Sequence, residues 1–436
     1  MGLRRAYRAR PVKEVKLELG SEVCQGAHVG FDIGKAELLA VVRWTNGHFE
    51  RPWLVKNPDE IQALVGLLTQ MAGAGPLTLA MEPTGTYGDA LRQALSDAGL
   101  LLHRVGAKAS HDYAEIFDGV PSQHDGKDAA VIAELAAIGK SVEWKYRPPN
   151  EVDQELAYHV DWMDAQQRQY AMWTGRLEGI LARHWPEATR WMKLSSATLL
   201  RVLEHYGGPA GLAQDSQAPA ALSRRGGPFL AAEKIRGLIQ SAVTSMGVRQ
   251  TAIDVQRMQR YAEQALAARS EIVKSRRRLE ELAQGNAAIQ RQAQAVGAAT
   301  ACVLWVHLGD PKEYHCAEAY RKAMGLNLTE RSSGMYQGKL RISKRGFSQV
   351  RRWLYFGALR MVTKEPVRQW YRQKKSKDGE QAKRALIGVM RKLALALYGV
   401  GVRAESFDTW RLFPGAGLQR DKSSIESSRT TRRRTG

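Results

Sequence analysis

Between residues 28 and 56, apolar residues occur in three short runs separated by turn residues. These runs predict strands at 28–35, 37–44 and about 48–55. Asn46-Gly47 lies between the second and third runs and favours a tight hairpin, because both residues tolerate positive φ. The pattern therefore predicts an antiparallel three-stranded meander.

After residue 57 the pattern changes, and helical segments alternate with strand-like segments. Apolar residues follow Asn57-Pro58 at helical spacing, at Ile61, Leu64, Val65, Leu67 and Leu68. We then expect a strand that ends at Glu82, and further a helix over about 89–98, a strand over about 100–105 and a helix from Asp125 to about 140. A meander followed by alternating helices and strands is the order of a ribonuclease H-like α/β domain.

Residues 150 to 290 carry an almost wholly helical pattern. Beyond about residue 230, apolar residues recur every three or four positions, at Ile235, Ile239, Ala242, Met246, Ile253, Met258, Ala262, Leu266, Ile272, Leu279, Leu282 and Ile289. This spacing fits either a long two-helix hairpin or coiled coil that holds subunits together, or an ordinary packed bundle. Gly207-Gly208-Pro209 and Gly226-Gly227-Pro228 predict breaks between helices.

These patterns divide the chain into five expected segments. The last of them ends in Arg432-Arg433-Arg434 and has the composition of a disordered tail. The segments are a basic arm at 1–27, a ribonuclease H-like domain at 28–145, a helical coiled-coil linker at 146–290, an α-helical C-terminal domain at 291–400 and the basic tail at 401–436.

Composition adds a strong positive charge to this picture. The 436 residues include 65 Lys and Arg against 44 Asp and Glu, a formal net charge of +21. Such a charge indicates a polyanionic partner, most simply DNA or RNA. On charge alone, a basic protein that binds nucleic acid without chemistry is an alternative.

Cysteine usage and hydropathy exclude other classes. Cys24, Cys302 and Cys316 are too few and too scattered for a disulfide framework or a cysteine zinc site. No apolar run reaches the ~20 residues of a transmembrane helix, and the N-terminus lacks the apolar segment of a signal peptide. We therefore expect a cytoplasmic protein with no membrane partner.

Four acidic residues lie at the ends of the predicted elements. Asp32 lies in the first strand and Glu82 closes another, while Asp125 and Asp128 share one helix face because they stand three residues apart. A ribonuclease H-like sheet would bring these elements together. Carboxylates that converge on one or two Mg²⁺ ions suit phosphodiester chemistry. We predict that all four are metal ligands and catalytic residues.

Each of these signals has another reading when it stands alone. Gly30 and Gly34 flank Asp32 and leave room for phosphate or backbone to approach, yet Asp32-Ile-Gly-Lys could also open an actin-like ATPase. Asp125 and Asp128 could simply complement the dipole of their helix. The joint position of the three elements favours the metal site.

A second candidate site is the basic loop at 331–346, which holds the adjacent residues Ser332 and Ser333 before Gly334. Serine before glycine is common in turns, and a serine nucleophile needs activation, for which no histidine lies beside it. The cations would neutralise phosphates without reading sequence. We predict nucleic-acid contacts by Arg331, Lys339, Arg341, Lys344, Arg345, Arg351 and Arg352.

The ordered set of motifs resembles the transposases of insertion sequence family 110, including the eleven-eleven subgroup. The resemblance covers most of residues 28–400. It is carried by Val29-Gly-Phe-Asp-Ile-Gly-Lys-Ala-Glu37, Met81-Glu-Pro-Thr-Gly-Thr-Tyr87, Asp125-Gly-Lys-Asp-Ala129, Gly325-Leu326, Ser332-Ser-Gly334, Ile342-Ser-Lys-Arg-Gly346 and Val389-Met-Arg-Lys-Leu393.

The resemblance implies a resolvase-like domain with an Asp-Glu-Asp-Asp site, a coiled-coil linker and a C-terminal domain with a catalytic serine. By position, Asp32, Glu82, Asp125 and Asp128 form the quartet and Ser333 is the nucleophile, with Ser332 as its competitor. The implied protein is a recombinase, guided by a noncoding bridge RNA, that joins donor and target DNA as a dimer or tetramer on the bacterial nucleoid.

One departure and three alternatives accompany this reading. The family often has a Pro-Gly-x-Gly hairpin where this chain has Ala295-Val-Gly-Ala-Ala-Thr-Ala301, which weakens a helix–hairpin–helix assignment there. A metal-dependent junction-resolving nuclease would use the quartet with water as the nucleophile. An actin-like ATPase or a non-catalytic binding protein would leave the serine loop without a chemical role.

Overall fold

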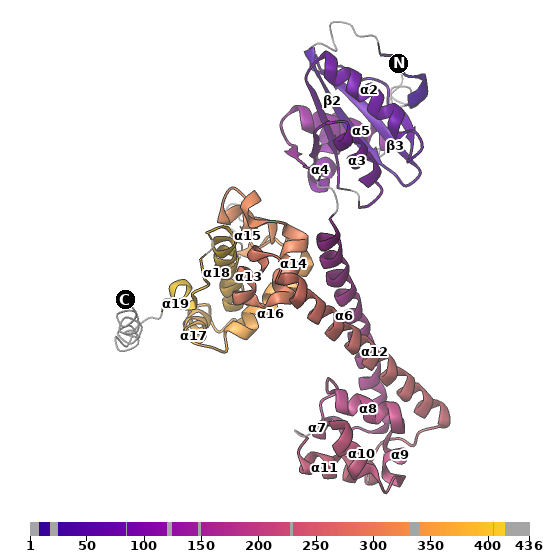
Figure 1. Ribbon diagram of the computed structural model, residues 1–436, viewed down its shortest axis with the longest axis vertical. Helices are drawn as coiled ribbons and strands as arrows, with labels where there is room; N and C mark the ends of the chain where they lie inside the picture. Colours follow the sequence, from indigo (N-terminus) through magenta and orange to yellow (C-terminus); the bar gives the residue numbers. More distant parts are fainter. Residues whose placement is uncertain are drawn as a thin grey trace, which may run out of the picture. The chain divides into compact units, whose positions relative to one another are not determined.

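The computed structural model describes residues 8–17, 25–83, 85–119, 124–146, 150–226, 230–330, 338, 340–403 and 405–414. The chain forms two compact units, an N-terminal unit up to residue 149 and a C-terminal unit from residue 150. The expected α/β domain followed by a mainly helical remainder is confirmed (Figure 1).

A seven-stranded sheet forms the centre of the N-terminal unit, with the strand order β1-β4-β3-β2-β5-β6-β7. β2, β3 and β4 form the predicted antiparallel meander, and β5 and β6 continue parallel to β2. This central order is consistent with a ribonuclease H-like domain. The strands are β1 (Arg10–Pro11), β2 (Ala27–Ile33), β3 (Glu37–Trp44), β4 (Trp53–Lys56), β5 (Leu77–Met81), β6 (Leu102–Arg104) and β7 (Val142–Glu143).

Helices cover both faces of the sheet. Alternate residues of β2 point to opposite faces, so Val29 and Phe31 pack against α2 and α3, whereas Gly30 faces α5. α4 also packs against α5 on that second face. The helices are α2 (Ile61–Ala74), α3 (Asp89–Asp97), α4 (Ala107–Asp118) and α5 (Asp125–Ala137).

The predicted strand at 37–44 has the bounds of β3, and α2 and α3 lie where helices were predicted. The third strand is shorter than predicted. Ala40 pairs with Trp53, but Arg43 bridges Phe49, so two residues of β3 face three residues of the next strand. This extra residue is a β-bulge, and Pro52 within it has no N–H to donate.

Three elements of the N-terminal unit were not predicted from the sequence. β1 lies in the segment expected to be a basic arm, where it pairs with β4 while Val12 enters the core. α4 and β7 were also not predicted. β1 and β7 have two residues each, too few for a periodic pattern, and α4 buries only Ser110 fully.

The C-terminal unit is built on two long helices, α6 (Glu151–His184) and α12 (Ala252–Ala283), which lie side by side (Figure 1). Arg278 of α12 donates two hydrogen bonds to Glu155 of α6, at 2.6 and 2.9 Å. The hairpin expected within 230–290 is therefore wrong in its pairing. The partner of α12 is a helix about a hundred residues earlier in the chain, which periodicity cannot identify.

Two separate hydrophobic cores lie along this helix pair. One contains Leu177 and Leu181 of α6, Met258 of α12 and α7 (Ala188–Trp191), α8 (Ala197–Tyr206), α9 (Pro209–Gln214), α10 (Ala218–Gly226) and α11 (Ala232–Val243). The predicted breaks follow α8, at Gly207 with φ +66°, and α10, which ends at Gly226. The helices of this region therefore pack as a bundle, the other alternative that the sequence left open.

The other core contains Leu156 and Val160 of α6, Leu279 of α12 and the helices that follow. These are α13 (Ala287–Val296), α14 (Ala298–Leu308), α15 (Ala317–Ala323), α16 (Ser348–Met361), α17 (Val367–Lys377), α18 (Ala382–Arg403) and α19 (Thr409–Leu412), with the two-stranded ribbon β8 (Leu328–Thr329) and β9 (Arg341–Ile342). The first part of the expected tail at 401–436 is instead folded, because Phe413 is buried in this core.

α13 and α14 form a helical hairpin in spite of the missing proline motif. They are joined by Gly297 alone, whose φ is +84°. This conformation is easy for glycine, so a reversal here needs no proline.

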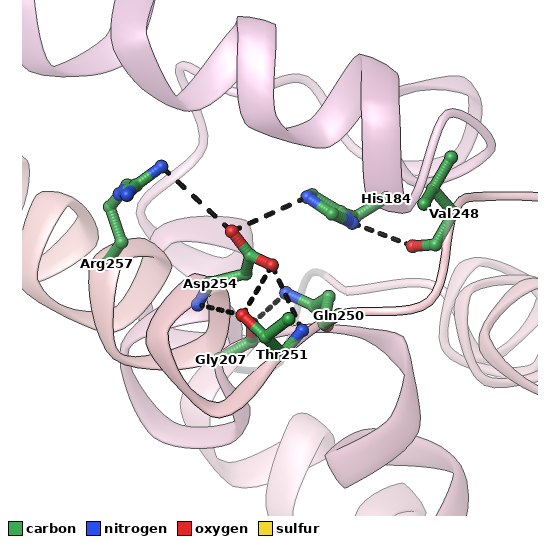
Figure 2. A network of polar contacts seen from close by, with 7 residues as sticks. All are labelled: His184, Gly207, Val248, Gln250, Thr251, Asp254 and Arg257. Atoms are coloured by element: carbon green, nitrogen blue, oxygen red, sulfur yellow. Dashed lines mark hydrogen bonds and ion pairs between the residues drawn. The ribbon is translucent and has the colours of Figure 1, made fainter.

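A polar network fixes the end of α6 to the start of α12 (Figure 2). The His184 imidazole donates from Nδ1 to the Val248 carbonyl at 2.7 Å, and its Nε2 lies 3.9 Å from Asp254. Asp254 and Thr251 form a capping box at the start of α12, which satisfies the unpaired N–H groups there. The turn before α12 is thus held from both sides.

α18 is the one described helix with the length and composition of a membrane span. More than half of its apolar window is buried, and it contributes six residues to the core just described: Leu386, Val389, Met390, Leu393, Ala394 and Leu397.

Candidate metal centre

Asp32 and Glu82 lie side by side at one edge of the sheet. β2 and β5 are parallel, and their last registered pair is Phe31 with Met81. Asp32 and Glu82 are the next residues of the two segments, so both come at the carboxyl ends of neighbouring strands. Side-chain alternation directs both toward the face covered by α4 and α5.

α5 brings Asp125 and Asp128 to the same edge. His124 caps this helix by accepting a hydrogen bond from the Lys127 backbone N–H at 3.1 Å. Both aspartates lie in the first turn. Asp32, Asp125 and Asp128 each place one carboxylate oxygen within 4.8 Å of the other two. The structure thus brings three members of the predicted quartet together.

Gly30 allows α5 to approach β2 this closely. A Cβ at Gly30 would lie 2.2 Å from the Ala129 carbonyl oxygen and 2.4 Å from the Ala133 nitrogen. At Gly34 a Cβ would lie 2.6 Å from the Glu37 carbonyl oxygen, in the turn to β3. Both glycines therefore make room for the backbone of this chain, the second of the two options that the sequence left open.

The carboxylates repel one another in the absence of a cation. Burial and the negative charges of Asp125, Asp128 and Glu82 together raise the pKa of Asp32 to about 6. Burial and Asp125 also raise the pKa of Asp128, against the opposing effect of His124 and Lys127. Like charges held together at a site that also buries them are a sign of function rather than of stability.

Glu82 is held at the site by α4. The Ser110 hydroxyl donates a hydrogen bond to its carboxylate, and Ser110 is almost completely buried. At the other end of α4, Asp118 accepts a hydrogen bond from the buried Lys127 ammonium at 2.7 Å. α4 therefore links Glu82 to the first turn of α5.

α4 was not predicted from the sequence, and neither were the contacts of Ser110, Asp118 and Lys127. A signal was present in Tyr113 and Phe117, which stand four residues apart, and in Gly119, which has φ +67° at the end of the helix. That spacing and a terminal glycine are typical of a helix end.

The predicted nucleophile Ser333 and its competitor Ser332 lie outside the described residues, as do Arg331 and Lys339. The segment that carries them connects β8 with β9, whose pairing joins Leu328 to Ile342 and Thr329 to Arg341. Ser343 donates a backbone hydrogen bond to the Asn327 carbonyl at 2.6 Å. The described residues thus hold the two ends of the serine segment together.

The predicted cations divide into two groups. Arg341, Lys344 and Arg345 are exposed beside the ribbon. Arg351 instead donates to the Gly346 carbonyl at 2.7 Å, and Arg352 pairs with Asp164, which is buried. Burial lowers the pKa of both arginines. The side chains of Arg351 and Arg352 therefore make contacts within the chain.

Comparisons with known proteins agree with this site. A family model described as "Transposase" of the IS110 DEDD type matches residues 29–186, and one described as "Transposase IS116/IS110/IS902 family" matches residues 288–373. Together they cover more than half of the chain. The chain belongs to the IS116/IS110/IS902 transposase family. It is therefore an enzyme that acts on DNA.

A curated relative spans nearly the same length as this transposase. It is an uncharacterized 43.6 kDa protein of insertion element IS110 from Streptomyces coelicolor, 23% identical over 410 residues, which are 90% of this chain and 98% of the relative. A DEDD domain implies a divalent metal ion. Asp32, Asp125 and Asp128 fit that requirement, because three carboxylates in one cluster are the oxygen ligands that such ions prefer.

Proposed function

We propose that this transposase cuts and rejoins donor and target DNA through a covalent serine–DNA intermediate, guided by a noncoding bridge RNA. The observation that carries the proposal is the cluster of Asp32, Asp125 and Asp128 beside Glu82, in a chain of this family. The proposal assigns these four residues as metal ligands and Ser333 as the nucleophile.

In this scheme the acidic residues would hold the metal ion that positions the reacting phosphate. One or two Mg²⁺ ions, when bound there, would neutralise charge on the scissile phosphate. Asp32, Asp125 and Asp128 supply the ligands, and Ser110 keeps the Glu82 carboxylate turned toward them. Lys127 and Asp118 hold the first turn of α5 in position.

Ser333 supplies the covalent chemistry. Its Oγ forms a bond to the scissile phosphorus while the bond from phosphorus to a deoxyribose oxygen breaks, and the serine proton leaves to a base. Attack by a hydroxyl of the second DNA molecule on the same phosphorus then restores a phosphodiester and releases the serine. No water is consumed, so the DNA is rejoined rather than hydrolysed.

The proposed partners follow from charge and from the resemblance. A net charge of +21 suits two nucleic acids at once, DNA and the guide RNA. Arg341, Lys344 and Arg345 are exposed at the base of the serine segment and suit phosphate contacts. A homodimer or homotetramer on the bacterial nucleoid would bring donor and target together.

The test of the nucleophile compares two neighbouring serines. Ser333→Ala should abolish the covalent protein–DNA adduct on a denaturing gel, and Ser332→Ala should keep it. Asp32→Asn should also abolish the adduct, while DNA binding in EDTA is retained. If Ser332→Ala alone removes the adduct, the residue assignment is wrong. If both serine variants keep it, the serine mechanism fails.

A junction-resolving nuclease is the second candidate, because the same carboxylate cluster suits hydrolysis by water. It predicts free DNA ends with no protein adduct, and full cleavage by the Ser332→Ala and Ser333→Ala variants. Membership of a transposase family leaves no support for the actin-like ATPase or the non-catalytic binding protein.

The RNA partner requires its own test. Purification of the protein from its host, followed by sequencing of the bound RNA, should recover one abundant structured RNA. Bulk RNA without enrichment would contradict RNA guidance and leave the serine chemistry untouched.

A further inference from the structure

A strongly basic corner joins α17 to α18, and nothing in the candidate metal centre uses it. Between Arg368 and Arg384 the chain has seven Lys and Arg against two Asp and Glu. The matched family region ends at residue 373, so most of this corner lies beyond it. We infer that the corner binds the phosphate backbone of duplex DNA without regard to sequence.

α17 has one face for the core and one for solvent. Val367 is buried, and Trp370 packs edge-on against Phe413 with ring centroids 5.3 Å apart. These contacts fix the rotation of the helix. Arg368 and Arg372, one turn apart, are exposed away from that contact.

Ion pairs hold the turn between the helices. Asp378 is 7% exposed and lies 2.7 Å from Lys374 and 3.8 Å from Arg384. Lys375 pairs with Glu380 at 2.6 Å. Both acidic residues of the corner are thus occupied by cations of the corner itself.

Three further cations have no such duty. Arg372, Lys377 and Lys383 are exposed, and within the described part of the chain none of them forms a direct ion pair. Arg372 feels the charge of Glu365, but Glu365 is paired directly with Arg368 at 2.7 Å. Exposed cations without a direct ion pair lose little on contact with phosphate, because no close internal pair must break. The corner therefore combines a fixed turn with three available charges.

The shape and composition of the corner favour duplex DNA. From Arg368 to Lys377 the helix rises about 14 Å, which is about four nucleotides of one DNA strand at ~3.4 Å each. Single-stranded nucleic acids are bound chiefly by exposed aromatic rings. Trp370 and Tyr371, the aromatic residues of α17, instead pack against the core.

This inference rests on the proposed function only in that the transposase acts on DNA, and it is tested without cleavage. Binding of the full-length protein to a duplex DNA of arbitrary sequence is measured in EDTA by fluorescence anisotropy over a range of salt concentrations. The test variant combines Arg372→Gln, Lys377→Gln and Lys383→Gln. The control removes the same charges at exposed, unpaired positions elsewhere: Lys193→Gln, Lys234→Gln and Arg236→Gln.

The test variant should bind duplex DNA about tenfold more weakly, and the magnitude of the slope of log K against log salt should fall by about 2 to 3. The control variant should change both the affinity and the salt slope by less. A variant with Arg372→Lys, Lys377→Arg and Lys383→Arg should bind like the original protein, which separates charge from misfolding. Equal losses in test and control would overturn the inference. The same measurement is repeated with double-stranded and single-stranded RNA, and a loss of affinity for RNA alone would also overturn it.

Failure here would leave the serine adduct intact. Conversely, loss of the adduct in Ser333→Ala or Asp32→Asn leaves binding in EDTA unchanged, so the two proposals fail separately.

Discussion

The two units treat their buried acidic residues in opposite ways. In the C-terminal unit, Asp164 is buried beside Arg168 at 3.2 Å and is also paired with Arg352. In the N-terminal unit, Asp32 is partly buried beside three other carboxylates, and its pKa rises to about 6. A paired charge is part of the framework, whereas a group of like charges is destabilising until a cation joins it.

The central element pairs of the two units also differ in their contacts. α5 touches β2 backbone to backbone at Gly30, whereas α6 and α12 are held by long side chains such as Arg278 and Glu155. The close contact at Gly30 fixes the position of Asp125 and Asp128 on α5 relative to Asp32 on β2. The following experiments test this contrast, in order of decreasing effect.

Gly30→Ala should have the largest effect on the N-terminal unit. The new methyl group would meet the backbone of α5 at 2.2 and 2.4 Å, and such overpacking lowers the free energy of unfolding by ~3 kcal/mol. It should also push Asp125 and Asp128 away from Asp32 and weaken metal binding. Chemical denaturation and metal titration measure the two effects.

The matched control is Gly66→Ala on the exposed side of α2, where nothing lies within 4 Å of a new Cβ. It should raise stability by about 0.5–1 kcal/mol, because alanine favours a helix over glycine. Equal behaviour of the two variants would show that the backbone contact at Gly30 is unimportant.

Asp164→Asn should destabilise the C-terminal unit. Removal of one member of a fully buried ion pair lowers stability by about 3–5 kcal/mol. Because Arg352 is 38% exposed and therefore partly solvated, we expect about 2 kcal/mol here. The thermal unfolding of the C-terminal unit reports it, and an unchanged midpoint would contradict the structural role of this pair.

Asp32→Asn, the same change in the other unit, should have the opposite sign. Since the folded state raises the pKa of Asp32 from its ordinary value to about 6, it favours the neutral carboxyl. That contribution is fully present below about pH 4 and is lost as the pH rises through 6. In EDTA above pH 7, Asn should therefore stabilise the N-terminal unit, by about 1–2 kcal/mol after allowance for solvent screening.

A divalent metal should make the original protein more stable than Asp32→Asn, because the metal stabilises only the protein that keeps its ligand. Denaturation at pH 5 and pH 8, with and without metal, gives the complete comparison. If Asp32→Asn destabilises the protein at pH 8 in EDTA, the carboxylate cluster is not a site of net repulsion.

Ser110→Ala should have the smallest effect. It removes the hydrogen bond to Glu82 and should weaken metal binding by about 1 kcal/mol, or roughly fivefold, with little change in stability. Thr69→Ala is the control, because the Thr69 hydroxyl bonds only the Val65 carbonyl of its own helix. Calorimetric metal titration distinguishes the two. Equal affinities would show that α4 does not position Glu82.

The sequence determined the meander, the helices over residues 61–74 and 89–97, and the positions of four acidic residues at the ends of elements. These features depend on local periodicity and turn chemistry, which neighbouring residues specify. It also determined that residues 150–290 are helical and that the protein is basic enough for nucleic acid.

Only the tertiary structure decided which elements meet. The pairing of α12 with α6, the strand β1 within the basic arm and the role of α4 beneath Glu82 all depend on contacts between residues far apart in the chain. The same is true of Gly30, whose importance lies in the backbone of α5 about a hundred residues later. A local pattern states what a segment prefers, but the burial of its apolar face against a particular partner depends on the whole chain.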